Sequence, residues 1–282
     1  MKSAEWIPPD LDISVPSMSR TYDYMLGGAH NFAADRAVGE RIEAAMPGLR
    51  AAARVNRAFL ARAVRHLVDR GVRQFLDVGS GIPTVGNVHE VAQAQVPGCR
   101  VLYVDRDPVA VAHSELLLRD NDRAAVLRAD MRDPESVLTS PEAARLLDLD
   151  EPVGLLMLLV LHWVPDEDDP RGLVARYRDA LAPGSWFAMT HVTADHQGEG
   201  LTEATGAIER SRSPDRVTAR SRAGIAELFS GFDLVEPGLV GCAAWRPGGP
   251  GDIADETGMN ALVYGGVGRK AHDADCRAAF RR

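Results

Sequence analysis

The sequence contains few cysteines and lacks the spacings that bind metals. Its three cysteines, Cys99, Cys242 and Cys276, lie far apart, and no Cys-x-x-Cys pair occurs. Neither an HExxH nor a GxSxG motif is present. These absences exclude a disulfide scaffold, a zinc site of the usual spacing and two common hydrolase signatures. We expect reduced thiols and no metal.

Long apolar runs and a basic character are also missing. The longest apolar run, residues 153–161, is far too short to cross a bilayer, and residues 1–10 lack the apolar core of a secretory signal. Lysine occurs only at Lys2 and Lys270, and the net charge is −8. An acidic chain has no global basic field to attract nucleic acid, which argues mildly against that partner. We therefore expect a cytoplasmic protein that binds neither membrane nor nucleic acid.

What the sequence does contain is an alternation of strand-like and helix-like segments after residue 71. Apolar segments predict strands at 74–78, 100–104, 125–129, 153–160, 185–191, 233–240 and 261–265. Helical patterns occur at 85–95, 108–119, 141–147, 173–181 and 223–229. This alternation predicts an α/β fold with a parallel sheet covered by helices on both faces.

Two segments lie outside this alternation. Residues 1–70 form a proline-containing arm followed by helices at 34–46 and 51–69, which we interpret as an N-terminal cap ahead of a domain at 71–282. Residues 193–220 are polar and rich in Gly, Ser, Thr and Arg, with a short helix near 201–210. Such an insertion is either a lid over the site or a plain solvated connection, and the sequence leaves both open.

The first strand runs into the sequence Asp77-Val78-Gly79-Ser80-Gly81. The two glycines let the chain turn tightly and approach a ligand, because they carry no Cβ. The N-terminus of the helix that follows favours an anionic group. The GxGxxG signature of dinucleotide sites fails, because Thr84 stands at the third glycine position. The turn therefore favours a cofactor without a pyrophosphate, such as S-adenosylmethionine, over a nicotinamide dinucleotide.

Acidic residues follow the second and third strands. Asp105 comes directly after the second strand, where a carboxylate can accept hydrogen bonds from both ribose hydroxyls. Asp130 follows the third strand and is expected at the adenine amino group, with Met131 packed on the ring. Asp133 precedes Pro134 and fits a helix cap. The alternative for Asp105 is a solvated acid in the turn that leads to the next helix.

These motifs, in this order, resemble motifs I, II and III of the class I S-adenosylmethionine-dependent methyltransferases. Further segments resemble one bacterial methyltransferase family of unassigned substrate: SRTYDYMLGG (19–28), NFAADR (31–36), GNVHE (86–90), LHWVPD (161–166) and GGVGRK (265–270). The resemblance covers residues 12 to about 270. It implies a Rossmann-like sheet of seven strands in the order 3-2-1-4-5-7-6, with strand 7 antiparallel, and it implies no substrate.

The resemblance also implies a cofactor site at the ends of the first four strands. The residues around the methionine part of the cofactor would be Asp77, Gly79, Ser80 and Gly81. Those at the ribose would be Asp105 and Arg106, and those at the adenine Asp130 and Met131. Leu161 and His162 would border the sulfonium and the methyl acceptor.

Four N-terminal residues are candidates for substrate contacts: Arg20, Tyr22, Tyr24 and Asn31. They lie close together in the sequence around a pair of glycines that predicts an abrupt turn. We hypothesise that this segment folds over the cofactor site. The alternative is a packing cap, in which the two tyrosines cover apolar surface and form local hydrogen bonds.

His162 is the candidate general base. The methyl group of a sulfonium is already activated, so the protein mainly aligns the acceptor and removes a proton where the acceptor requires it. Histidine is the side chain best suited to that task near pH 7. His162 and His191 follow the fourth and fifth strands. A purely structural role is the alternative for both.

The sequence as a whole predicts an S-adenosylmethionine-dependent methyltransferase that acts on a small-molecule acceptor. Two alternatives stay open, namely a nicotinamide-dependent oxidoreductase and a non-catalytic sensor of an adenosyl ligand. The sequence predicts neither the acceptor nor the oligomeric state.

Overall fold

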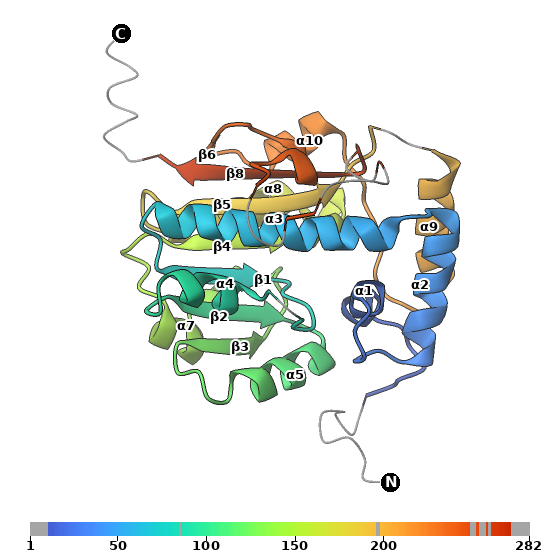
Figure 1. The fold of residues 1–282 in the computed structure, drawn as a ribbon, viewed down its shortest axis with the longest axis horizontal. Coiled ribbons are helices and arrows are strands. Elements are labelled where there is room, and N and C mark those ends of the chain that lie inside the picture. Colours follow the sequence, from blue (N-terminus) through green and yellow to red (C-terminus); the bar gives the residue numbers. More distant parts are fainter. Residues whose placement is uncertain are drawn as a thin grey trace.

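The computed structural model describes residues 11–84, 86–195, 198–248, 252–253, 258 and 261–271. Residues 1–10 of the arm expected at 1–16, and Cys276, therefore lie outside the described residues. Figure 1 shows a sheet with helices on both faces and a further group of helices beyond the ends toward which the parallel strands point. The strands are β1 (Gln74–Val78), β2 (Arg100–Asp105), β3 (Ala124–Arg128), β4 (Gly154–Leu158), β5 (Trp186–Val192), β6 (Phe232–Leu234), β7 (Val240–Gly241) and β8 (Val263–Lys270).

The strand order is β3-β2-β1-β4-β5-β8-β6 in the described part of the chain, with β7 paired to β8. Strands β1 to β5 are parallel, and β8 runs antiparallel to β5, β6 and β7. This is the topology that the resemblance implies. The antiparallel strand is β8 here because the two-residue strand β7 precedes it in the chain.

Helices cover both faces of the sheet (Figure 1). Their bounds are α1 (Met18–Leu26), α2 (Ala33–Ala45), α3 (Leu49–Asp69), α4 (Val88–Gln95), α5 (Pro108–Leu118), α6 (Pro134–Leu138), α7 (Pro141–Leu146), α8 (Pro170–Ala180), α9 (Glu199–Glu209) and α10 (Arg222–Glu227). One apolar core joins the sheet to α3, α4 and α5, and another joins it to α6, α7, α8 and α10. Short 3-10 helices occur as η1 (Leu161–Trp163), η2 (Asp166–Asp168) and η3 (Cys242–Ala244).

Three strands differ from the expectation by more than one residue at an end. Strand β4 ends at Leu158, because Leu159 adopts a φ of 50° and leaves the extended region. Strand β6 is short, because Pro237 and Gly238 interrupt the apolar run that predicted residues 233–240. Strand β8 continues to Lys270 through glycines, which weaken the strand signal in the sequence.

The N-terminal helices form a separate apolar cluster with α9. Helix α1 ends at Gly27, whose φ of 83° and N–H bond to the carbonyl of Tyr24 make the abrupt turn that the sequence predicts. Side chains of α1, α2 and the start of α3 pack against Ala204, Ala207 and Ile208 of α9. This cap stands beyond the carboxyl ends of the parallel strands (Figure 1).

Candidate active site

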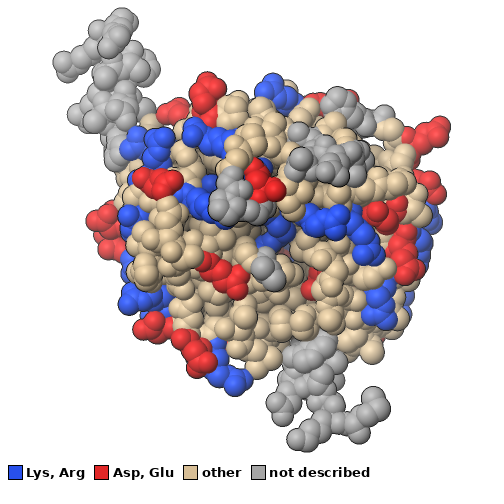
Figure 2. All heavy atoms as spheres, viewed as in Figure 1, with Lys and Arg blue, Asp and Glu red and all other residues tan. Residues whose placement is uncertain are grey.

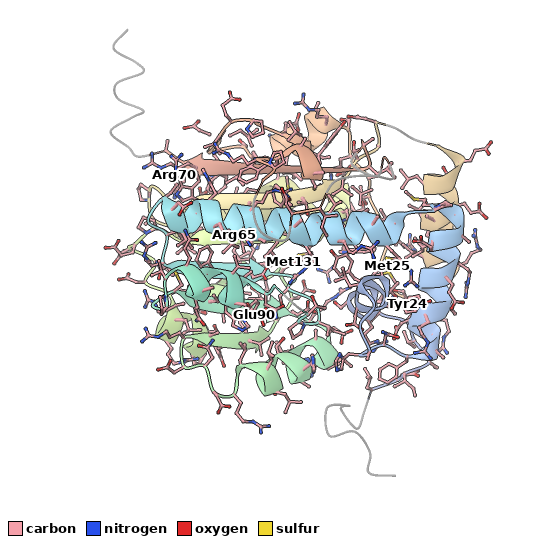
Figure 3. The ribbon with its side chains drawn as sticks, viewed as in Figure 1. Tyr24, Met25, Arg65, Arg70, Glu90 and Met131 are labelled. Carbon is pink, nitrogen blue, oxygen red and sulfur yellow. The ribbon has the colours of Figure 1, made fainter. Side chains whose placement is uncertain are left out.

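A cavity of about 700 Å³ lies between the carboxyl ends of the parallel strands and the cap. This edge of an open α/β sheet is where such folds bind ligands. The loops after β1, β2 and β3 form one end of the cavity. Its other end, which we call the apolar chamber, is lined by side chains of α1, α2, α3 and α9, namely Met25, Ile42, Met46, Leu49, Leu201 and Ile208. Met25 lies on the α1 side and Met131 on the sheet side of this space (Figure 3).

Two glycines shape the turn after β1. Gly79 and Gly81 have φ values of 71° and 67°, in the left-handed region. A Cβ on Gly79 would stand 2.2 Å from Cγ2 of Val160, whereas one on Gly81 would meet nothing within 4 Å. Between them, the hydroxyl of Ser80 is buried beside the cavity and has no hydrogen-bond partner among the described residues. The turn therefore has an unsatisfied polar group at the point where a ligand would approach.

Asp77 lies in β1 with its side chain in the wall of the cavity, and it is 6% exposed. Burial raises the pKa of its carboxyl from 3.8 to about 7, while Arg57 opposes this rise and Asp105 adds to it. The carboxyl is thus divided between its neutral and charged forms near neutral pH. A cationic or donating ligand group would stabilise the charged form.

Asp105 joins the turns after β1 and β2. One carboxyl oxygen accepts a hydrogen bond from the N–H of Gly81 at 2.7 Å, and the other accepts from the N–H of Asp107 at 2.8 Å. Burial raises the pKa of Asp105 to about 6, although these two backbone hydrogen bonds lower it. Each oxygen retains a further lone pair. The carboxyl can therefore hold both turns and still accept from a ligand hydroxyl.

Arg106 lines the cavity, but its guanidinium pairs with the carboxylate of Asp215. The side chain of Arg106 is 49% exposed and that of Asp215 is 8% exposed. Asp215 also accepts a hydrogen bond from the hydroxyl of Ser213 at 3.1 Å. The residue expected at the ribose therefore joins the loop after β2 to the insertion at 193–220.

Asp130 and Met131 line the cavity at the loop after β3. Arg132 pairs with Asp130 at 2.6 Å, and this hydrogen bonding keeps the pKa of Asp130 below its usual value. The carbonyl of Met131 accepts a hydrogen bond from the hydroxyl of Tyr177 at 3.0 Å, which ties the loop to α8. Asp133 caps α6 by accepting from the N–H of Ser136, as its position before a proline predicts.

The two residues expected at the end of β4 have different environments. His162 lines the cavity together with Val160. Leu161 is fully buried in the core that contains α8, and it is not among the cavity residues. The side chains of Leu161 and His162 differ in this way because successive side chains point in different directions in the tight turn of η1, and the contact of Leu161 with the cofactor stays a prediction.

His162 is 5% exposed, and its Nδ1 has no hydrogen-bond partner among the described residues. Burial lowers the pKa of this imidazole well below 6.5, and the neighbouring His191 and Arg220 add to the effect. The ring is therefore neutral at physiological pH. A neutral imidazole with an unpartnered nitrogen can accept a hydrogen bond from a molecule in the cavity.

Arg220 and His191 support the turn that carries His162. Arg220 donates to the carbonyl of Leu161 at 3.1 Å, and its Nη1 lies 2.8 Å from Nε2 of His191. A guanidinium can only donate, so Nε2 of His191 accepts and its Nδ1–H donates to the carbonyl of Val192 at 2.7 Å. Burial lowers the pKa of His191 to about 4, which agrees with this neutral tautomer.

Two of the four N-terminal candidates, Arg20 and Tyr22, line the cavity. Arg20 is buried and paired with Asp35 at 3.0 Å. The hydroxyl of Tyr22 donates to the carbonyl of Ala53 at 3.2 Å and accepts from Nδ2 of Asn56 at 3.0 Å. The polar groups of Arg20 and Tyr22 therefore have partners within the protein, which agrees with the packing alternative. Their position in the cavity wall agrees with the substrate hypothesis.

Tyr24 and Asn31 are not among the cavity residues. The hydroxyl of Tyr24 lies 3.3 Å from the carboxylate of Glu40, and Arg50 stacks over its ring at 4.4 Å. Figure 3 shows Tyr24 beside α2, away from the sheet. Asn31 donates to the carboxylate of Asp23 at 2.8 Å and so fixes the turn after α1. The contacts of both residues therefore lie within the cap and outside the cavity wall, and a role of either in substrate binding stays a prediction.

Sequence reasoning missed the cavity residues of α3. Asn56 lies in the cavity wall, where its carbonyl oxygen accepts from the hydroxyl of Thr190 at 2.7 Å. Leu49 and Leu60 line the cavity from the same helix. The one available signal was a polar asparagine within an otherwise apolar helical face, and this signal is weak without the fold.

The insertion at 193–220 contributes part of the cavity wall on the side of the cap. It leaves and re-enters the body of the protein at one point, where Thr193 and Arg220 form a parallel bridge. Between these ends, α9 contributes Leu201 and Ile208 to the cavity wall. The N–H of Thr218 donates to the carbonyl of His162 at 2.8 Å. The helix expected near 201–210 is present as α9.

The residues at the polar end fit an adenosyl cofactor with a methionine part. The turn leaves no room for a Cβ at Gly79, Ser80 has a buried unsatisfied hydroxyl, and the carboxyls of Asp77 and Asp105 face the same space. Within the described residues, no group of three or more His, Cys, Asp or Glu side chains is placed to hold a metal ion. The described helices are all too short or too polar to span a bilayer.

Comparison with known proteins identifies the family. A family model described as S-adenosyl methyltransferase matches residues 4–271. The structure is similar to that of a provisionally assigned methyltransferase from Thermobifida fusca YX, with 40% identity, a TM-score of 0.88, and coverage of 95% of this chain and 100% of that one.

A second similar structure is that of a DUF574 family protein from Streptomyces avermitilis MA-4680, with 38% identity, a TM-score of 0.86, and coverage of 92% and 99% of the two chains. A search among curated proteins found no significant match. The family match covers nearly the whole chain and agrees with the strand order and with the turn after β1. The chain therefore belongs to the S-adenosyl methyltransferase family and is an S-adenosylmethionine-dependent methyltransferase.

Proposed function

We propose that the protein transfers a methyl group from S-adenosylmethionine to a small-molecule acceptor. The observation that carries the proposal is the shape of the cavity, which joins a polar end at the strand loops to an apolar chamber under the cap. Bound S-adenosylmethionine supplies an activated methyl group. The chain supplies the cofactor contacts, the acceptor chamber and the exclusion of water between them.

In this proposal each loop holds one part of the cofactor. Asp77, together with the turn that contains Ser80, holds the methionine part, and Asp105 accepts from the ribose hydroxyls. Asp130 and Met131 contact the adenine, which requires Asp130 to share its carboxylate with Arg132. His162 borders the acceptor. This assignment is supported by the fact that all of these residues line the same cavity.

A small acceptor fits this architecture better than a nucleic acid. The chamber lies beneath α1, α2 and α9, and we propose that 193–220 serves as a lid that must move when ligands exchange. Basic and acidic side chains are interspersed on the face shown in Figure 2, and neither sign forms a large patch there. A cytoplasmic location is part of the proposal, supported by the free thiols of Cys99 and Cys242.

The division of the chain is proposed on the same basis. Residues 1–70 would form the cap and residues 71–282 the catalytic domain. The cap supplies much of the chamber, and α3 belongs both to the cap cluster and to the core on the sheet. We therefore expect cap and sheet to unfold together in a single transition.

Calorimetry with S-adenosylmethionine tests the cofactor site. We expect the wild-type protein to bind it and Asp105→Asn to bind it at least about tenfold more weakly, because a charge-assisted acceptor is lost. Asp122→Asn is the matched control, since the Asp122 side chain is 93% exposed at a distant turn. Wild-type binding of NAD without binding of S-adenosylmethionine would contradict the proposal.

Release of S-adenosylhomocysteine from a panel of acceptors tests the transfer itself. We expect turnover with at least one small acceptor and none with RNA, DNA or unfolded protein. If the cofactor binds and no acceptor of any class is methylated, the alternative of an adenosyl-ligand sensor is favoured instead.

A further inference from the structure

The apolar chamber contains no obvious partner for a charged acceptor. Its wall consists of Met25, Ile42, Met46, Leu49, Leu201 and Ile208. An ion that enters such a space loses its hydration, and this loss is costly unless a counter-charge replaces it. The arginines that line the cavity are already engaged: Arg20 pairs with Asp35 at 3.0 Å, Arg57 donates to the carbonyl of Gly86 at 2.9 Å, Arg106 pairs with Asp215, and Arg132 pairs with Asp130.

The polar groups of Tyr22 and Asn56 are likewise committed. The Tyr22 hydroxyl is bonded to Ala53 and to Asn56, and the Asn56 carbonyl oxygen accepts from Thr190. An acceptor that binds here therefore gains little from these groups. This favours a molecule whose surface is largely apolar.

His162, at the edge of the apolar chamber, differs from these residues because it has a polar atom that is not committed to a partner. Its Nδ1 is buried, faces no partner among the described residues, and belongs to a side chain that lines the cavity. The ring of Trp163, which packs on the chamber cluster, lies 4.3 Å from the His162 ring, so the imidazole stands at the edge of the chamber. A buried polar atom without a partner is costly and calls for a ligand or a water.

The surroundings of His162 keep its ring uncharged. The ring is buried, and the guanidinium of Arg220 bonds to Nε2 of His191, whose ring is 5.9 Å from that of His162. Asp166, whose side chain is 75% exposed, pairs with Arg220 at 2.7 Å. In the tautomer protonated at Nε2, the uncharged ring offers the lone pair of Nδ1 to a donor, and this lone pair repels an anion.

We propose that the methyl acceptor is an uncharged, largely apolar molecule with one O–H or N–H group, and that this group donates a hydrogen bond to Nδ1 of His162. The inference rests on the methyl transfer proposed above and specifies its substrate class. Phosphorylated and carboxylated molecules are excluded as acceptors. His162 both orients the reacting group and can hold its proton at Nδ1.

Binding of three matched probes to the full-length protein tests this inference. The probes are 2-naphthol, naphthalene and 2-naphthoate, titrated after calorimetry has established that S-adenosylmethionine is bound. We expect 2-naphthol to bind about tenfold more tightly than naphthalene, which corresponds to one hydrogen bond. We expect 2-naphthoate to bind at least about tenfold more weakly than 2-naphthol.

The variant His162→Leu should remove the preference for 2-naphthol and leave the affinity for naphthalene unchanged. The control is His66→Leu, because His66 also has a buried nitrogen without a partner among the described residues but lies outside the cavity, against Trp186 and Trp245. This control should retain the preference. In wild-type protein with 15N-labelled histidine, 2-naphthol should shift the Nδ1 resonance of His162 and naphthalene should not, a readout that needs no variant.

Several outcomes would overturn the inference. Tight binding of 2-naphthoate contradicts an uncharged acceptor, and failure of both neutral probes to bind contradicts an apolar one. Persistence of the preference in folded His162→Leu, or an unchanged Nδ1 resonance, removes His162 from the site and leaves its nitrogen to a buried water. A protein that does not bind S-adenosylmethionine at all contradicts the proposed function, which the first calorimetric step reveals separately.

Discussion

The two ends of the cavity are built in different ways. At the strand loops, backbone hydrogen bonds set the geometry: the N–H of Gly79 donates to the carbonyl of Val104 at 2.8 Å, and that of Gly81 donates to Asp105 at 2.7 Å. At the apolar chamber, packing of helices from three parts of the chain sets it. The first kind of wall tolerates few changes, whereas the second can be altered one side chain at a time.

The largest effect on stability and cofactor binding is expected from Gly79→Ala, which disturbs the turn after β1. The new Cβ would stand 2.2 Å from Val160 in a residue whose φ is 71°. We expect a loss of about 3 kcal/mol in the free energy of unfolding, measured with urea, and a loss of cofactor binding. Gly98→Ala is the control, because its Cβ would meet nothing within 4 Å and its φ lies outside the left-handed region. Normal binding by Gly79→Ala would show that the turn can open.

A second effect, on the order of a few kcal/mol, is expected from Asp77→Asn, and it depends on pH. The folded protein holds the proton of Asp77 up to a pKa of about 7, whereas the unfolded chain releases it near 3.8. The free energy of unfolding of the wild type therefore falls as the pH rises from about 4 to about 7. That of Asp77→Asn does not, because the variant has no proton to release at this position. Melting temperatures across this range should show an advantage for Asp77→Asn that is absent near pH 4 and constant above pH 7. Asp122→Asn should parallel wild type, and an advantage independent of pH would refute this account.

A smaller effect is expected from the ion pair that joins the loop after β2 to the insertion at 193–220. Arg106 and Asp215 pair across the rim with half of the arginine exposed, so Arg106→Ala and Asp215→Ala should each cost no more than about 1 kcal/mol. We expect both variants to release the cofactor a few-fold faster by stopped-flow fluorescence. The exposed pair of Arg171 and Glu227 provides the control. Much weaker cofactor binding in Arg106→Ala alone would mean that Arg106 contacts the ribose directly.

The smallest effects separate the two tyrosines of α1. Tyr22→Phe leaves Nδ2 of Asn56 without its bond at 3.0 Å and should lower stability by about 1 kcal/mol. Tyr24→Phe removes only an exposed contact of 3.3 Å to Glu40 and should change neither stability nor turnover. Thermal unfolding and acceptor turnover of the two variants side by side provide the measurement. A turnover defect in Tyr24→Phe would restore it as a substrate contact.

The backbone-built end could be predicted from the sequence because its chemistry is local. Gly79 and Asp77 are neighbours in the chain, and Asp105 ends the next strand, so a parallel sheet necessarily brings them to one edge. The alternation of strands and helices predicted a parallel sheet, whereas the order of the strands was implied by the resemblance to class I methyltransferases. Arg106 shows the limit of this reasoning, because its partner Asp215 comes from an insertion whose path no local pattern specifies.

The packed end could not be predicted in the same way. Tyr22 and Tyr24 are two residues apart, and once α1 is helical such residues point to different sides, so only one of them can face the cavity. Met46, Ile208 and Asn56 come from separate helices and meet only through tertiary packing. A single sequence records the apolar character of these helices and not which of them face each other.

The bridge between Thr193 and Arg220 has a consequence for how this enzyme can diversify. Because the insertion starts and ends at this bridge, just beyond the end of β5, its length and composition can change without altering the register of the sheet. We therefore expect the segment, which supplies Leu201 and Ile208 to the chamber, to be exchangeable as a unit. Exchange of this segment between relatives would alter which acceptors are admitted while the cofactor end stays constant.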